Sequence, residues 1–149
     1  MEIERKFLLK NEEWRKYVSK KISIKQGYIC NTHDCVIRIR ITGETAYITV
    51  KGRGTSISRP EYEYEIPSKD AGEMFQLFCQ NANLEKTRNI VIYEGHKWEI
   101  DEYGGRHKGL ITAEVELKTE NEEIIIPSFI GKEVTGEAKY YNSNLVKNE

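Results

Sequence analysis

The sequence predicts a mainly antiparallel β protein of the α+β class, with eight strands and a few helices in one domain spanning residues 1–149. Charged and apolar side chains alternate with a period of two along most of the chain, which is typical of strands with two different faces. Glycine-containing turns separate the alternating segments at short intervals. A chain of 149 residues without a repeat, linker or low-complexity tract has the size of one domain.

The alternating segments are expected to form the eight strands. In chain order they cover residues 1–9, 22–30, 35–42, 45–53, 59–66, 84–94, 96–103 and 110–118. The turns are marked by Thr42-Gly43-Glu44, Gly52-Arg53-Gly54, Glu94-Gly95 and Gly104-Gly105, because glycine tolerates the backbone conformations that tight turns need.

Two helices are expected beside the strands, the first capped by Asn11 and the second by Ser68. Their core-facing residues, at helical spacing, are predicted to be Trp14, Tyr17 and Val18 in the first helix and Met74, Leu77 and Phe78 in the second. The last segment, 140–149, is compatible with a polar helix or a frayed tail.

Composition excludes several classes of partner. The net charge is −1, so no basic field points to a nucleic acid, and no apolar run is long enough to span a membrane. Three sparse cysteines suit reduced thiols in a cytoplasmic protein. Cys30, His33 and Cys35 lie close in the sequence but offer no convincing fourth ligand, so structural zinc is not expected.

The charged faces of the strands separate by sign. The main cationic positions are Arg38, Arg40, Lys51, Lys86 and Arg88, and the main anionic positions are Glu2, Glu4, Glu114 and Glu116. Two arrangements fit this pattern. In a sandwich the apolar faces form the core and the charges face water. In a tunnel the charges face inward, which requires a wet channel that binds an anion together with a divalent cation, because unpaired buried charge is very costly. Alternation alone does not choose between them.

The charged motifs follow one another in an order that resembles the CYTH superfamily, also called triphosphate tunnel metalloenzymes. The motifs are Glu2-x-Glu4-x-Lys6, Arg38-x-Arg40, Lys51-Gly52, Arg59-x-Glu61-x-Glu63, Lys86-x-Arg88, Asp101, Glu114-x-Glu116 and a late Lys139. Each is weak alone, but the ordered set covers about 140 residues. The resemblance implies a closed eight-stranded β-barrel, or tunnel, with a charged lumen and a few flanking helices.

The resemblance also implies roles for single residues. Metal ligands are expected at Glu2, Glu4, Glu61, Glu63, Asp101, Glu114 and Glu116, with Mg²⁺ or Mn²⁺ as the cofactor, since hard cations prefer carboxylates, water and phosphate oxygens. Phosphate contacts are expected from Lys6, Arg38, Arg40, Lys51, Arg53, Arg59, Lys86, Arg88 and Lys139. Catalytic roles are expected for Glu4, Lys6, Tyr28, Lys86 and Glu116, with a glutamate of the cluster as general base. Tyr28 either orients the phosphate beside Lys6 or is an ordinary packed tyrosine.

The expected activity is hydrolysis of a linear triphosphate by in-line attack of water. The short chain has no obvious insert for a base or thiazole pocket, which favours inorganic tripolyphosphate over nucleoside or thiamine triphosphates. A class IV adenylate cyclase, a thiamine or nucleotide triphosphatase, and a noncatalytic polyphosphate- or nucleotide-binding module are the alternatives. The expected partner is a small anion, with no nucleic acid and no membrane. The oligomeric state stays open, with a homodimer among the options.

Overall fold

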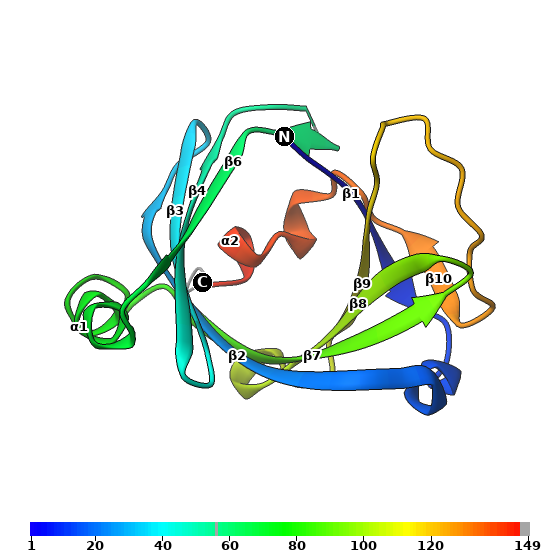
Figure 1. The fold of residues 1–149 in the computed structure, drawn as a ribbon, viewed down its shortest axis with the longest axis horizontal. Helices are drawn as coiled ribbons and strands as arrows, with labels where there is room; N and C mark the ends of the chain where they lie inside the picture. The colour runs from blue at the N-terminus through cyan, green and yellow to red at the C-terminus, as the bar shows by residue number, and fades with distance from the viewer. Residues whose placement is uncertain (56, 147–149) are drawn as a thin grey trace.

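The computed structural model describes residues 1–55 and 57–146, which form a strongly curved sheet that wraps around the C-terminal segment (Figure 1). The strands are β1 (Glu2–Leu9), β2 (Val18–Asn31), β3 (Cys35–Thr42), β4 (Thr45–Gly52), β5 (Ser58–Arg59), β6 (Glu61–Ile66), β7 (Asn83–Tyr93), β8 (His96–Tyr103), β9 (Ile111–Glu116) and β10 (Ile130–Glu133). The helices are η1 (Glu13–Tyr17), α1 (Ser68–Phe78), η2 (Gly105–His107), η3 (Ala138–Tyr140) and α2 (Asn142–Leu145), where η denotes a 3₁₀ helix.

All strand pairs are antiparallel, and neighbours in the sheet follow the order β10-β1-β9-β8-β7-β2-β3-β4-β6. The hydrogen-bonded path remains open between β6 and β10, and the short strand β5 partly fills the gap by pairing Arg59 with Glu2 of β1. The predicted tunnel is therefore confirmed, with ten strands instead of eight. The predicted strand 59–66 is split at Pro60, because proline has no backbone N–H to donate to a ladder. The short β10 was not predicted.

The apolar faces of the strands form the outside of the tunnel, and other segments cover two parts of it. One cluster packs beneath α1 and contains Ile39, Ala46, Ala71, Phe75 and Cys79. Gly27 of β2 makes this packing close, since a Cβ atom there would lie 2.4 Å from Cβ of Cys79. A second cluster includes Phe7, Trp14, Trp98, Val115 and Phe129, beneath η1 and the chain that follows β9.

Both predicted helices exist, but their details differ from the predictions. The first is a single 3₁₀ segment, and Val18 begins β2 instead of continuing the helix. The second begins directly after Pro67, with Ser68 as its first residue, not its cap. Its buried residues are Ala71 and Phe75, whereas Met74 is half-buried and Leu77 and Phe78 are exposed. The sheet therefore covers the side of the helix that carries Ala71 and Phe75, not the side that carries Leu77 and Phe78.

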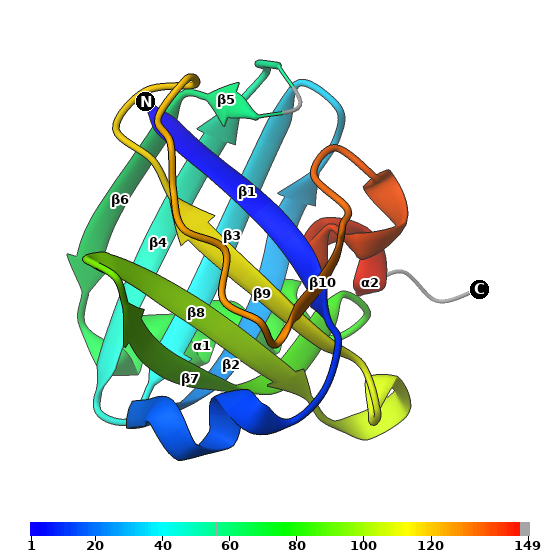
Figure 2. The ribbon, with the colours of Figure 1, turned by 90° about the vertical axis from the view of Figure 1, so that its right-hand side faces the viewer.

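A third apolar cluster lies inside the tunnel, at the end where the C-terminal segment enters (Figures 1 and 2). Tyr28, Val36, Leu84 and Tyr103 point inward from four strands and pack against Val146, which follows α2. The Asn31 side chain donates a 2.6 Å hydrogen bond to the Ser143 carbonyl, and the Tyr103 hydroxyl donates a 2.5 Å bond to Asn142. This end of the tunnel is therefore filled by the chain itself. Residues 147–149 of the predicted tail lie outside the described residues.

Among the described residues, none of the helices has the length and apolar character needed to cross a bilayer.

Candidate active site

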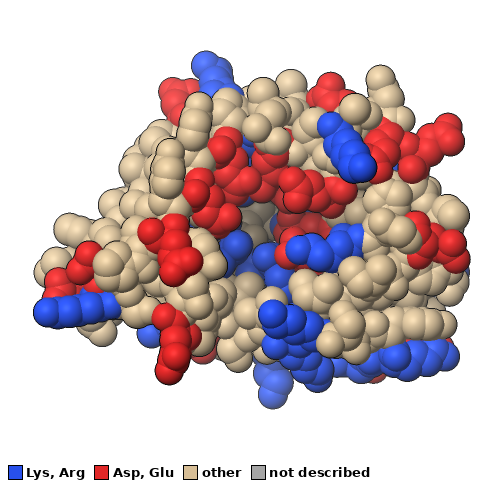
Figure 3. Space-filling view, in the orientation of Figure 1, with Lys and Arg blue, Asp and Glu red and all other residues tan. Residues whose placement is uncertain are grey.

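A cavity of about 430 Å³ occupies the charged part of the tunnel. Figure 3 shows its opening, with acidic side chains along the upper rim and basic side chains within and below it. The lining comes from all strands from β1 to β9 together with the C-terminal segment. Strand alternation explains this composition, because every second residue of these strands points into the lumen.

Strand register brings the acidic residues together. Glu4 lies opposite Glu116, and Lys6 lies opposite Glu114, in the ladder between β1 and β9. Burial and the neighbouring Glu114 carboxylate raise the pKa of Glu4 well above its usual value, while Glu114 keeps a pKa well below its usual value because Lys6 lies beside it. Glu4 is therefore the member of the pair that takes up a proton more readily, while Glu114 stays ionised.

A second carboxyl pair joins β1 to β6. Burial and a hydrogen bond to Glu2 raise the pKa of Glu61 to about 7. Glu2 itself has a lowered pKa because Lys51 and Glu61 outweigh its burial. Lys51 Nζ lies 3.0 Å from the Glu2 carboxylate and 3.7 Å from that of Glu61. The acidic side of the cavity therefore consists of two carboxyl pairs, each close to a lysine.

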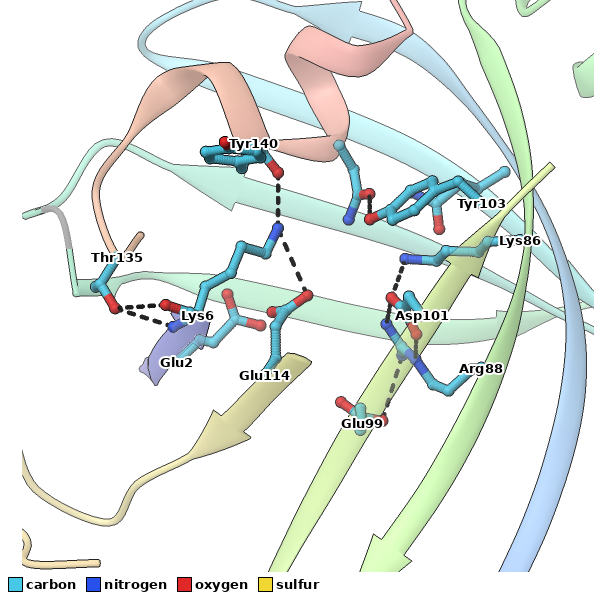
Figure 4. A network of polar contacts seen from close by, with 12 residues as sticks. Glu2, Lys6, Lys86, Arg88, Glu99, Asp101, Tyr103, Glu114, Thr135 and Tyr140 are labelled. Atoms are coloured by element: carbon cyan, nitrogen blue, oxygen red, sulfur yellow. Dashed lines mark hydrogen bonds and ion pairs between the residues drawn. The ribbon is translucent and has the colours of Figure 1, made fainter. Parts of the chain in front are cut away.

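Lys6 connects the acidic side to the C-terminal segment (Figure 4). Its Nζ donates a 2.8 Å hydrogen bond to the Tyr140 carbonyl and lies 3.7 Å from Glu114. Its backbone N–H donates to the Thr135 hydroxyl. Lys6 is thus held by both the acidic side and the segment that fills the rear of the tunnel.

A buried ion-pair network forms the floor behind the cavity (Figure 4). Arg88 donates two 2.9 Å hydrogen bonds to the Asp101 carboxylate and lies 3.3 Å from Glu99. Lys86 Nζ lies 2.7 Å from the same Asp101 carboxylate. Burial nevertheless lowers the pKa of Lys86 to about 7, helped by the nearby Arg88 and Arg40. Lys86 and Arg88 therefore share the Asp101 carboxylate, and Glu99 provides a second carboxylate beside Arg88.

Arg38 and Arg40 of β3 differ from these cations. Neither has a carboxylate within ion-pair distance among the described residues, although both line the cavity. Arg38 Nη2 donates a long 3.4 Å bond to Thr49, and its buried Nε has no partner in the described part of the chain. Burial together with Arg38 and Arg88 lowers the pKa of Arg40 to about 10. Such a pair of desolvated guanidinium groups is suited to an anion.

The structure brings most of the predicted site residues to one cavity. Its lining includes Glu2, Glu4, Lys6, Tyr28, Arg38, Arg40, Lys51, Arg53, Arg59, Glu61, Glu63, Arg88, Glu114 and Glu116. Arg53 and Glu116 are exposed at its edge. Lys86 and Asp101 lie buried behind Arg88 and do not line it. Lys139 is exposed on η3, with its Nζ over the Tyr140 ring, and does not line it either.

Several residues of the site were not predicted. Lys97, Glu99, Thr135 and Tyr141 line the cavity, and Gln26 lies directly behind Arg40. The alternation of charge along β8 could have identified Glu99, since it shares a face with Asp101. No comparable signal marks the C-terminal residues, because they reach the site through tertiary packing and not through strand periodicity.

The carboxyl groups fit a hard divalent cation by their chemistry. They provide only oxygen donors, which Mg²⁺ and Mn²⁺ prefer. In the described part of the chain no three His, Cys, Asp or Glu side chains converge at ligand distance, and one carboxyl of each pair has a raised pKa and so takes up a proton readily. A bound cation would replace these protons, so the two pairs are the groups that would hold it.

The fold and the site define an antiparallel tunnel whose interior combines buried cations with paired carboxyl groups. The chain belongs to the CYTH family, whose domain it matches over residues 1–146. It is 45% identical over 147 residues to an inorganic triphosphatase of Acetivibrio thermocellus, covering 99% of this chain and 94% of that protein. It is 32% identical over 148 residues to an inorganic triphosphatase of Nitrosomonas europaea, covering 97% and 95%.

Solved structures show the same fold. The crystal structure of an inorganic triphosphatase is similar with a TM-score of 0.69 and 28% identity, covering 100% of this chain and 96% of that one. A putative adenylate cyclase from Bacillus halodurans shares the fold at a TM-score of 0.64 and 16% identity, covering 80% and 82%.

Proposed function

We propose that this protein hydrolyses linear triphosphates, with inorganic tripolyphosphate as the preferred substrate. The observation that carries the proposal is the pair Arg38 and Arg40, which lack carboxylate partners in the described chain and face the same cavity as the two carboxyl pairs. A triphosphate with its divalent cation supplies an anion for the first set and a cation for the second.

Each group has a distinct task in this proposal. Arg38, Arg40 and Arg88 bind the phosphate oxygens and stabilise the charge that develops during in-line attack. Lys6, Lys51, Arg53 and Arg59 add further charge at the edge of the cavity. Glu2, Glu4, Glu61, Glu63, Glu114 and Glu116 hold Mg²⁺ or Mn²⁺, which would neutralise the carboxylates and polarise the phosphoryl oxygens.

Glu4 and Lys86 have different catalytic tasks in this proposal. Glu4 is the favoured base, since its carboxyl faces the cavity and would be ionised once a cation replaces its proton. Lys86 acts from behind the cavity, through its contact with Asp101, and does not touch the substrate directly. Lys139 would contact a phosphate only after a movement of the C-terminal segment.

Three features favour tripolyphosphate over the alternatives. The two relatives at 45% and 32% identity are inorganic triphosphatases. The rear of the tunnel contains Val146 and its neighbours, which occupy the space beside Tyr28 and Tyr103. The lining is dominated by charged side chains, and its described aromatic residues are Tyr28 and Tyr141. A cyclase, a thiamine or nucleotide triphosphatase, and a noncatalytic binding module remain the alternatives.

The proposal extends to the setting of the enzyme. We expect a cytoplasmic protein with no nucleic-acid partner. A homodimer is the proposed assembly, with the exposed Tyr62 and Tyr64 of the edge strand β6 as candidate contacts. Sedimentation of the wild type and of a Tyr62→Ser, Tyr64→Ser variant tests it, since a monomeric wild type would refute the dimer.

The activity is tested by measuring phosphate release from tripolyphosphate, ATP and thiamine triphosphate, with EDTA, Mg²⁺ or Mn²⁺. We expect kcat/KM for tripolyphosphate to exceed that for ATP at least about tenfold, or roughly 1.4 kcal/mol of discrimination. Cyclic AMP and diphosphate as the main products from ATP would instead identify a cyclase. Binding without any turnover would identify the noncatalytic module.

A further inference from the structure

Gln26 lies between two residues of the proposed site without lining the cavity itself. Its side chain is fully buried at 0% exposure, on β2 opposite Arg40 of β3. Arg40 Nε donates a 3.3 Å hydrogen bond to Gln26 Oε1, and Gln26 Nε2 donates a 3.1 Å bond to the Tyr28 hydroxyl oxygen. Both Arg40 and Tyr28 line the cavity.

The chemistry of the three side chains fixes the direction of these hydrogen bonds. A guanidinium has donors only, so the amide must turn its oxygen towards Arg40. The amide nitrogen, which has donors only, then faces the Tyr28 oxygen. The Tyr28 hydroxyl accepts this bond, and its own proton remains available for another acceptor. The order of donors therefore runs from Arg40 through Gln26 to Tyr28.

Because Gln26 is a neutral partner, it does not neutralise the positive charge of Arg40. The groups around this guanidinium include Arg38, Arg88 and the more distant carboxylates of Asp101 and Glu63. No carboxylate among the described residues lies within ion-pair distance of Arg40. An amide oxygen anchors the Nε edge but leaves the positive charge unneutralised and directed at the cavity. A carboxylate at position 26 would anchor the same edge and cancel the charge.

We propose that Gln26 is a positioning residue that presents two donors to the substrate, the Arg40 guanidinium and the Tyr28 hydroxyl proton. This inference rests on the proposed function of the cavity as a phosphate site. It also assigns an orientation to Tyr28, whose hydroxyl donates to a phosphate oxygen because its acceptor side is already occupied by the amide.

The test compares Gln26→Glu with Gln26→Met. The glutamate has nearly the same shape, but its carboxylate accepts from both neighbours, so it pairs with Arg40 and turns the Tyr28 proton away from the cavity. The methionine removes both hydrogen bonds without adding charge. Gln76→Glu on the outer helix α1 is the matched control, since Gln76 is exposed and remote from the tunnel.

We expect Gln26→Glu to lower kcat/KM for tripolyphosphate by about 100-fold at pH 8, mainly through KM, with an unchanged or higher melting temperature. The defect should persist throughout pH 5.5–8.5, because Arg38 and Arg40 on β3 and Lys86 on β7 surround the introduced carboxyl and keep it ionised. Gln26→Met should lose about 10-fold, with no change in pH dependence relative to the wild type.

Two results would overturn the inference. One is Gln26→Glu kinetics within about twofold of the wild type throughout pH 5.5–8.5. The other is a Gln26→Glu loss no larger than that of Gln26→Met, which would indicate packing and not charge. If Gln26→Glu does not fold, the decision falls to Gln26→Met in the wild-type and Tyr28→Phe backgrounds: a smaller loss in the second supports the inference, and equal losses reject it.

Calorimetric binding of tripolyphosphate separates this inference from the proposed activity. Wild-type protein that binds tripolyphosphate but does not hydrolyse it would refute the activity. The dissociation constants of Gln26→Glu and Gln26→Met, each relative to the wild type, would then decide the role of Gln26, with the larger loss expected for the glutamate.

Discussion

The carboxyl pair formed by Glu61 and Glu2 should make the metal-free protein less stable as the pH rises. The pKa of Glu61 is raised from 4.5 to about 7 by burial and by its hydrogen bond to Glu2. A carboxyl whose pKa is higher in the folded state than in the unfolded state stabilises the fold while it is protonated. That contribution is fully present below about pH 4.5 and is lost as the pH rises through about 7.

The size of this pH-dependent loss of stability follows from the pKa shift of Glu61. A full shift from 4.5 to about 7 corresponds to about 3.4 kcal/mol. The Glu61 side chain is 22% exposed and Lys51 lies 3.7 Å away, so solvent and the lysine reduce the effective penalty. We therefore expect the free energy of unfolding to fall by about half of that value, roughly 1.5 kcal/mol, between pH 5 and pH 8.5. For a chain of this size that equals about 3–6 °C in melting temperature.

Glu61→Gln tests this directly, because the amide donates to Glu2 without needing a proton. In EDTA the variant should match the wild type near pH 5 and exceed it by roughly 1.5 kcal/mol at pH 8.5, measured by urea unfolding. Glu65→Gln is the control, since Glu65 lies on the same strand and is exposed. It should leave the pH dependence unchanged. With Mg²⁺ the order should reverse, because the wild type gains stability from the cation and the variant gains less.

The reasoning fails if Glu61→Gln and wild type differ by a constant amount at all pH values in EDTA. It also fails if Glu65→Gln removes the pH dependence as well, since the effect would then belong to net charge and not to the pair.

Other predictions follow from the same geometry. Arg38→Ala and Arg40→Ala should each lower kcat/KM for tripolyphosphate by roughly 1.5–3 kcal/mol, with Arg5→Ala on the outer face as a control that leaves it unchanged; wild-type kinetics in both would place the phosphate elsewhere. Tripolyphosphate should raise the pKa of Lys86 from about 7, so binding at pH 7.5 should take up protons in calorimetry with different buffers, and Lys86→Met should abolish the uptake. Val146→Asp should release the C-terminal segment and expose Tyr140 and Tyr141 to chymotrypsin, whereas Leu77→Asp at an exposed position should not; equal cleavage would mean that Val146 does not anchor it.

Strand positions could be read from the sequence because alternation is a local property. The ladders from β2 to β4 and from β7 to β9 fall close to the predicted ranges. Alternation could not decide which face points inward, since a sandwich and a tunnel bury one face each. The order of the charged motifs decided that through the family resemblance. β10 was missed because it is short and contains Gly131, which strands normally avoid. Glycine is needed there because a Cβ atom at this position would lie 3.2 Å from the Leu8 carbonyl oxygen.

The position of the C-terminal segment inside the tunnel and the role of Gln26 could not be predicted from the sequence, for a related reason. Residues 142–146 read as a polar segment, and only Leu145 and Val146 are apolar. Their burial depends on the inward-facing Tyr28, Leu84 and Tyr103, which come from distant parts of the chain. Gln26 is a single amide in an ordinary strand, and its importance depends on the two partners that the fold places at its ends.

The charges of the tunnel are arranged so that the folded protein alone cannot neutralise them. Lys51, Lys86 and Arg88 have carboxylate partners, but Arg38 and Arg40 do not among the described residues. The carboxyl pairs of β1, β6 and β9 lie beside Lys6 and Lys51, and burial together with mutual repulsion still raises the pKa values of Glu4 and Glu61. Desolvated groups of either sign destabilise the fold until a counter-charge arrives. A ligand that carries both signs, a phosphate chain with a divalent cation, removes both penalties at once. The free energy by which these desolvated charges destabilise the ligand-free fold is therefore a measure of the binding energy that is released when the ligand enters.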